Sequence, residues 1–155
     1  MAVYIRPGTA DDLPQALSLI QELATFEREP DAVEATIESM QIDGFGERPV
    51  FEYFVAEVAG KIVGLSLYFY SYSTWKGKCL YLEDLIVTES HRGQGIGRQL
   101  LDRIVAQAKE SGSKRAVWQV LDWNEPALNF YNKYSASIEE GWLNASLSKE
   151  QILKS

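Results

Sequence analysis

The sequence predicts an α/β protein with a mixed, mostly antiparallel sheet flanked by helices, in one domain over residues 1–155. Three observations indicate this class. Residues 80–87 form an apolar run broken only by Glu83 and Asp84, which is typical of a buried strand. Residues 96–108 repeat apolar side chains at helical spacing over three turns. Strand-like segments joined by short turns precede this pair, and further strand and helix patterns follow it.

The N-terminal part of the chain predicts one strand and two helices. Residues 3–5 form a short apolar segment that we interpret as the first strand. A helix capped by Thr9 or Asp11 follows. Its apolar stripe runs from Leu13 to Ala24, and the helix ends at Phe26-Glu27. We expect a second helix over residues 30–44, because Pro and Asp are typical of a helix start and Gly of its end.

The remaining elements follow from turns and caps. Gly60 lies in a short turn, which predicts a hairpin between the apolar segments on either side. Asn124 is a typical N-cap residue in front of a further helix. A strand that follows the long helix is most simply parallel to residues 80–87. The predicted elements are strands over residues 51–58, 62–70, 116–121 and 142–147, and a helix over residues 125–134.

Composition and charge limit the function. An apolar fraction of 46% and a charged fraction of 24% are ordinary for a soluble globular domain. The net charge of −7 argues against a nucleic-acid partner and suits a cationic small molecule. A single cysteine, Cys79, excludes an intrachain disulfide. Neither a leader nor an apolar run of membrane-spanning length is visible, so we expect a cytoplasmic protein without a membrane partner. Metal-ligand spacing is absent, so no metal is expected.

A glycine-rich turn separates the central strand from the long helix. Its sequence, residues 92–97, reads Arg-Gly-Gln-Gly-Ile-Gly. Glycine lets the backbone approach a ligand, and the unpaired N–H groups of a first helical turn attract anions. Arg92 adds a positive charge, so one interpretation is a diphosphate site. A tightly packed turn that binds nothing is the alternative.

This turn resembles the Arg/Gln-x-x-Gly-x-Gly/Ala signature of the GNAT superfamily of acetyl-CoA-dependent N-acetyltransferases. Other segments resemble its diamine (spermidine/spermine) and thialysine N-acetyltransferase branch, and the likeness runs from Ile5 to about Trp142. The segments that carry it are Tyr72-Ser73-Thr74-Trp75-Lys76-Gly77-Lys78, Leu80-Tyr81-Leu82-Glu83-Asp84, Trp123-Asn124-Glu125-Pro126 and Asn129-Phe130-Tyr131.

The resemblance implies the GNAT fold, in which the two parallel central strands splay apart and admit the pantetheine arm of acetyl-CoA. It implies a homodimer. Backbone N–H groups of residues 85–87 are implied as donors to the thioester carbonyl oxygen. The implied cofactor-binding residues are Leu85, Ile86, Val87, Arg92, Gly93, Gln94, Gly95, Ile96, Gly97, Arg98, Asn124, Pro126, Ala127 and Tyr131.

Two residues carry the implied chemistry. Tyr131 matches the general-acid tyrosine of the family, and it lies seven residues after Asn124, on the same helical face. Its phenol holds a transferable proton at neutral pH. A core tyrosine beside Phe130 is the alternative. Glu83 matches the residue that helps deprotonate the amine, through a water.

The implied substrate residues are Glu27, Trp75, Glu83, Asp84 and Glu140. Glu83 and Asp84 point to opposite faces of a regular strand, and a local kink would let both serve one site. A structural ion pair is the alternative for Asp84. Polyamine-acetylating members carry an acid where this chain has Ser73, so the sequence at this position resembles the thialysine-type members more closely.

The sequence therefore predicts transfer of an acetyl group to a primary amine of a small cationic substrate, thialysine-like, lysine-like or a diamine, by direct attack in a ternary complex. Two alternatives stay open. One is a CoA-binding regulatory module without turnover, and the other is acetylation of a lysine in a peptide or protein.

Overall fold

A computed structural model describes residues 2–155 of the protein. The chain divides into two compact units, the first ending at Gln119 and the second beginning at Val120. The first unit holds β1 (Tyr4–Pro7), a 3₁₀ turn η1 (Ala10–Asp12), α1 (Leu13–Phe26), α2 (Ile37–Phe45), β2 (Glu52–Val58), β3 (Lys61–Ser73), β4 (Gly77–Val87), a second 3₁₀ turn η2 (Glu89–His91), α3 (Ile96–Glu110) and β5 (Arg115–Val117). The second unit holds α4 (Glu125–Lys133) and α5 (Lys149–Leu153).

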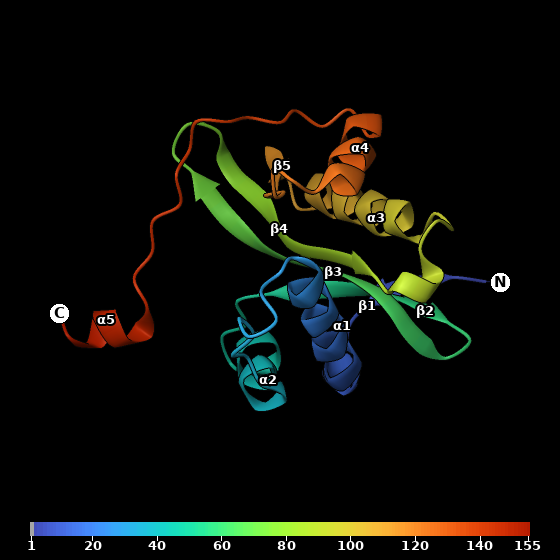
Figure 1. Ribbon diagram of the computed structural model, residues 1–155, viewed down its shortest axis with the longest axis horizontal. Helices are drawn as coiled ribbons and strands as arrows, with labels where there is room; N and C mark the ends of the chain where they lie inside the picture. The colour runs from blue at the N-terminus through green and yellow to red at the C-terminus, as the bar shows by residue number, and fades with distance from the viewer. Residues whose placement is uncertain (1) are drawn as a thin grey trace. The chain divides into compact units, whose positions relative to one another are not determined.

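The five strands form one sheet in the order β1-β2-β3-β4-β5 (Figure 1). The pairs β1–β2, β2–β3 and β3–β4 are antiparallel, whereas β4 and β5 are parallel. The helix α3 links the parallel pair, as a crossover connection requires. The prediction of a mixed, mostly antiparallel sheet is confirmed.

Helices cover both faces of this sheet. Figure 1 shows α1 and α2 on one face and α3 on the other. The core under α1 and α2 consists of Leu13, Ala16, Leu19, Met40, Tyr53, Val55, Ile62, Leu65, Leu67 and Ile86. On α3, the apolar stripe that the sequence predicts is buried through Ile96, Leu100, Leu101 and Ile104.

A glycine on β3 brings α3 close to the sheet. A Cβ atom on Gly64 would lie 2.9 Å from the carbonyl oxygen of Ile86 and 3.1 Å from Cδ1 of Leu100. The contact with Ile86 leaves no room for a side chain, and the contact with Leu100 would require that leucine of α3 to shift. This close approach sets the beginning of α3 beside the end of β4.

The parallel pair separates after three residues. Cys79, Leu80 and Tyr81 pair with residues 115–117, while β4 continues to Val87 with β3 as its one partner strand. The strand predicted over residues 116–121 is therefore shorter than expected, since β5 ends where its pairing with β4 ends. The parallel pair of central strands expected from the family resemblance is present.

Two predicted elements are wrong. The second helix begins at Ile37 rather than near residue 30, because Thr36 is extended and its side chain accepts a hydrogen bond from the N–H of Ser39. Residues 142–147 form no strand among the described residues. Trp142 and Leu143 in this segment are 78% and 96% exposed, so the segment lacks the neighbouring strand that pairing needs. Instead, Ser148 caps the unpredicted helix α5.

Candidate active site

A β-bulge on β4 shapes the candidate active site. Across the β3–β4 ladder, Leu67 lies opposite Asp84 and Tyr68 lies opposite Leu82. Glu83 is therefore the extra residue of the bulge, without a partner on β3. A bulge bends a strand and redirects its side chains. The local kink considered from the sequence is present at this position.

The bulge reverses the alternation of side chains along β4. Neighbours on a strand point to opposite faces, and residues opposite one another across a ladder share a face. Leu67 belongs to the core under α1, so Asp84 lies on the α1 face of the sheet. Leu82, opposite Tyr68, lies on the α3 face. The carboxylate thereby lies on the face that α1 covers.

Two neighbouring carboxylates act on Asp84 at this position. Burial, the largest cause, and the negative charges of Glu83 and Glu27 together raise the pKa of Asp84 to about 6. Glu27 caps the C-terminus of α1, and burial raises the pKa of its carboxyl group too. Glu83 is exposed. A cation bound beside these carboxylates would stabilise their ionised forms.

The glycine-rich turn leads into α3 with two residues in left-handed backbone conformation. Gly93 has φ of 75° and Gly95, the N-cap of α3, has φ of 79°. A Cβ atom at either position would meet no atom within 4 Å among the described residues. The first N–H groups of α3 have no acceptor within the helix. The turn thus offers backbone donors beside open space, as an anion site requires.

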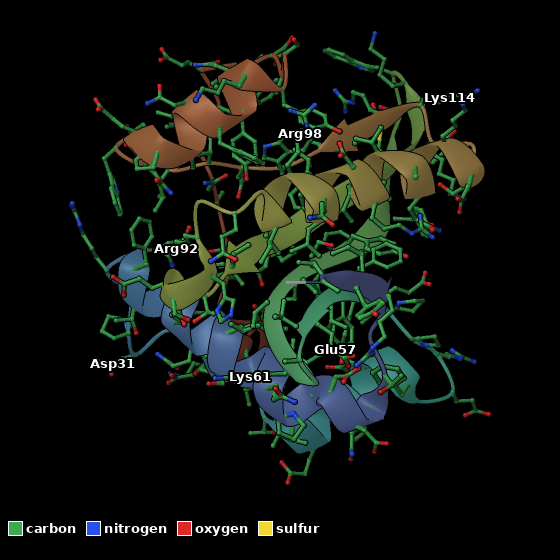
Figure 2. The ribbon with its side chains drawn as sticks, turned by 90° about the vertical axis from the view of Figure 1, so that its right-hand side faces the viewer. Asp31, Glu57, Lys61, Arg92, Arg98 and Lys114 are labelled. Atoms are coloured by element: carbon green, nitrogen blue, oxygen red, sulfur yellow. The ribbon has the colours of Figure 1, made fainter. Side chains whose placement is uncertain are left out.

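The side chain of Arg92 interacts with β4 and α1 of the first unit. Its Nε donates to the carbonyl oxygen of Val87 at 2.9 Å, and its Nη2 lies 3.3 Å from Oε2 of Glu22. The guanidinium also lies 5.6 Å from the centre of the Phe26 ring. Figure 2 shows the labelled Arg92 next to α1. Its charge therefore has a carboxylate partner on α1.

The second unit carries the predicted helix with Tyr131. The side chain of Asn124 caps α4 by accepting a hydrogen bond from the N–H of Ala127 at 3.3 Å, as predicted, and Pro126 lies in the first turn. Tyr131 is 8% exposed, and its ring meets that of Phe130 edge to face at 5.3 Å between centroids.

Two further predicted substrate residues are exposed. Trp75, 87% exposed, lies at the tip of the β3–β4 hairpin, where Ser73 Oγ accepts hydrogen bonds from the N–H groups of Trp75 and Lys76 at 3.2 and 3.1 Å. Six residues of β4 separate this tip from Glu83, which corresponds to about 20 Å. Glu140 is exposed in the irregular segment after α4.

The first unit therefore holds two sets of predicted site residues, the acidic substrate residues and the residues at the end of β4 and the start of α3. Glu27, Glu83 and Asp84 form the acidic cluster. Residues 85–87 end β4, and residues 92–98 form the glycine-rich turn and the first turn of α3. The predicted residues of the second unit are Asn124, Pro126, Ala127, Tyr131 and Glu140.

Sequence reasoning missed Glu22, which holds the segment in front of the glycine-rich turn. Glu22 on α1 accepts a hydrogen bond from the hydroxyl of Thr88 at 2.8 Å and one from the N–H of Glu89 at 3.1 Å. More than 60 residues separate these groups along the chain. No local pattern marks such a contact, because Glu22 looks like an ordinary polar residue of an amphipathic helix.

Among residues 2–155, no three His, Cys, Asp or Glu side chains are arranged to hold a metal ion. In the same part of the chain, no helix has the length and apolar character needed to cross a bilayer.

Known proteins are similar along almost the whole chain. The sequence is 38% identical to a thialysine N-epsilon-acetyltransferase of Bos taurus over 90% of this chain and 89% of that protein. It is 38% identical to the spermidine/spermine N(1)-acetyltransferase-like protein 1 of Homo sapiens, over 96% of this chain and 23% of that longer protein.

Solved structures share the fold at lower sequence identity. An integron cassette protein from the mobile metagenome of V. cholerae has a TM-score of 0.80 at 23% identity, over 99% of this chain and 97% of the other. An aminoglycoside acetyltransferase from an uncultured soil metagenomic sample, in complex with sisomicin, has a TM-score of 0.77 at 22% identity over 94% and 95%. The model of the acetyltransferase (GNAT) family matches residues 15–135. The chain therefore belongs to the GNAT family and is an N-acetyltransferase.

Proposed function

We propose that this protein transfers the acetyl group of acetyl-CoA to a primary amine of a small cationic molecule, with thialysine, lysine and short diamines as the candidate substrates. The observation that carries this proposal is the cluster of Glu27, Glu83 and Asp84, in which burial and then the two neighbouring negative charges raise the pKa of Asp84. Such a cluster favours a cation over a neutral or anionic group. One relative is named as a thialysine acetyltransferase and another as a spermidine/spermine acetyltransferase-like protein, and both names support the same substrate class.

Acetyl-CoA supplies an activated thioester carbonyl. The glycine-rich turn suits its diphosphate, because Gly93 and Gly95 hold their backbone in a left-handed conformation and leave open space above it. The N–H groups at the start of α3 then serve as donors. Residues 85–87, on the part of β4 beyond its pairing with β5, are the proposed donors to the acyl oxygen.

Glu83 and Asp84 have different proposed roles. A protonated amine has no lone pair, so it must lose a proton before it attacks. Glu83 is exposed on the bulge and accepts this proton through a water. Asp84 is more buried and holds the positive charge of the substrate on the α1 face of the sheet, together with Glu27.

Tyr131 is the proposed general acid. A phenol keeps its proton at neutral pH and can donate it to the departing thiolate. The match of Asn129-Phe130-Tyr131 to the family pattern supports this role. The Asn124 cap supports it as well, because it fixes the start of the helix that carries Tyr131.

We further propose a homodimer in which Trp75 contacts the substrate bound to the partner chain. Trp75 is exposed, and about 20 Å of β4 separates its hairpin tip from Glu83. A small amine cannot touch both within one chain. Co-expression of Trp75→Ala and Glu83→Gln chains tests this arrangement, because a mixed dimer contains one intact shared site. Recovery of activity supports the shared site. If the two inactive variants remain inactive when they are co-expressed, the shared site is contradicted.

Thiol release from acetyl-CoA tests the reaction itself. The panel comprises thialysine, lysine, putrescine, spermidine and a lysine-containing peptide. We expect turnover with at least one small amine and a loss of it in Glu83→Gln. CoA binding without turnover on any amine would instead identify a regulatory module, and turnover on the peptide alone would identify a protein lysine acetyltransferase.

A further inference from the structure

A carboxylate on α1 holds the segment that leads into the glycine-rich turn. Oε1 of Glu22 accepts from the hydroxyl of Thr88 at 2.8 Å, and Oε2 accepts from the N–H of Glu89 at 3.1 Å. Nη2 of Arg92 lies 3.3 Å from the same Oε2. Three donors from one short segment therefore meet on one side chain of a different element.

The segment is also tied internally. Nε of Arg92 donates to the carbonyl oxygen of Val87, the last residue of β4, at 2.9 Å. The backbone N–H of Thr88 donates to the carbonyl oxygen of Val63 at 2.8 Å. Gly93 follows Arg92 directly, so these bonds fix the point at which the left-handed turn begins.

We infer that Glu22 is a positioning residue for the diphosphate site, and that Arg92 acts with it by holding the turn rather than by contacting the phosphates. The geometry of Arg92 supports this division. Its Nε and Nη2 both have acceptors within the protein, and its charge already faces a carboxylate. The backbone N–H groups after Gly93 then carry the phosphate contacts. This inference rests on the proposed use of acetyl-CoA.

Simple electrostatics and a positioning role predict opposite changes in CoA affinity when Glu22 is removed. Glu22 is a negative charge close to a site for a dianion, so its removal alone would tighten CoA binding. If Glu22 positions the turn, its removal weakens CoA binding, because the backbone donors lose their arrangement before the ligand arrives. The sign of the change thus decides between the two.

The experiment measures the Kd of CoA by calorimetry for the full-length protein and its variants. Glu22→Gln removes the charge, and Thr88→Val removes one donor while keeping the side-chain shape. We expect Glu22→Gln to weaken CoA about tenfold, as for loss of a charged hydrogen bond, and Thr88→Val to weaken it less. The KM of acetyl-CoA rises in parallel, and the KM of the amine stays the same. Glu34→Gln is the matched control, since Glu34 is exposed and lies outside helices and strands.

Arg92→Lys separates the two roles of the arginine. Lysine keeps the charge but lacks the fork that joins Val87 and Glu22. A positioning role predicts that Arg92→Lys loses as much CoA affinity as Arg92→Gln, and that Glu22→Gln combined with Arg92→Gln loses no more than the worse single variant.

Three results would overturn the inference: unchanged CoA affinity in both Glu22→Gln and Thr88→Val, tighter binding in Glu22→Gln, or full affinity in Arg92→Lys. Failure of the unsubstituted protein to bind CoA would instead refute the proposed function. Circular dichroism and the Tm establish that each variant is folded, and Thr88→Val keeps the test valid should Glu22→Gln fail to fold.

Discussion

Leu82 and Asp84 lie two residues apart on β4 yet point to opposite faces of the sheet, because the bulge at Glu83 separates them. In a regular strand both would share a face. The bulge allows Leu82 to pack on the α3 side while Asp84 faces α1 and Glu27. One extra residue in a core strand therefore places a carboxylate on the α1 face of the sheet.

The acidic cluster carries a stability cost that depends on pH. The pKa of Asp84 is about 6 in the folded protein against an ordinary value of 3.8, so folding disfavours its ionised form. Stability falls as the pH rises from about 4 to about 6 and stays lower above that. We expect Asp84→Asn to raise the free energy of unfolding by roughly 1–2 kcal/mol at pH 8, after allowance for solvent screening, and by almost nothing at pH 3.5. Urea denaturation at the two pH values measures this, and an equal effect at both would contradict it.

The same carboxyl group is expected to control the affinity for the amine. An amine with an ordinary lysine pKa stays mostly protonated between pH 5 and 8, so an inflection of the pH profile in that window belongs to the enzyme. We expect kcat/KM for thialysine to rise with pH and to level off above about pH 6, as Asp84 ionises. Asp84→Asn should remove this inflection, whereas Glu34→Gln should keep it. An inflection that survives in Asp84→Asn would assign it to another group.

Removal of one hydroxyl tests the proposed general acid. Tyr131→Phe keeps the buried ring and its edge-to-face contact with Phe130, so the fold should persist. We expect kcat to fall about a hundredfold, as for loss of an acid catalyst, with the KM of acetyl-CoA nearly unchanged. Tyr4→Phe makes the same chemical change at an exposed residue of β1 and should leave kcat unaltered. Steady-state rates that match in the two variants would remove Tyr131 from the mechanism.

Local sequence patterns predicted much of this fold. The apolar periodicity of residues 96–108 predicted α3, and Asn124 was correctly interpreted as the cap of α4. The start of α2 was misplaced because Pro and Asp near residue 30 form an equally plausible signal, while Thr36 makes the actual cap. A strand over residues 142–147 could not be decided locally, because a strand depends on a neighbour that the segment itself does not encode.

The candidate site residues also divide into those that the local sequence predicted and those that it could not predict. Glu83 and Asp84 stood out because two acids in an apolar strand are unusual, and a kink there was foreseeable. Its register was not, since the bulge depends on how β3 pairs with β4. Glu22 was missed because its partners, Thr88 and Glu89, approach it only in the folded chain.

The hairpin tip is expected to set the preferred length of the substrate. Ser73 Oγ accepts hydrogen bonds from two N–H groups of the turn, and an aspartate carboxylate can accept the same bonds. Ser73→Asp adds a charge for the far ammonium of a polyamine, so the kcat/KM ratio of spermidine to thialysine should rise about tenfold. Ser73→Asn keeps the turn without the charge and is the control. Equal ratios in Asp and Asn variants would mean that this position does not contact the substrate.

Alanine substitutions at two glycines with the same backbone conformation distinguish the effect of backbone strain from an effect on CoA binding. Gly95 has φ of 79° at the start of α3, and Gly60 has φ of 78° in the turn between β2 and β3. A Cβ atom meets no described atom within 4 Å at either, so alanine introduces only the left-handed strain, about 1–2 kcal/mol of stability. Gly95→Ala should also weaken CoA at least tenfold, because a methyl group then occupies the space beside the backbone donors, whereas Gly60→Ala should keep the Kd of CoA. Thermal denaturation and calorimetry on the two variants measure both effects. Equal loss of CoA affinity in the two would attribute it to reduced stability, and no loss in either would exclude the α3 turn as the phosphate site.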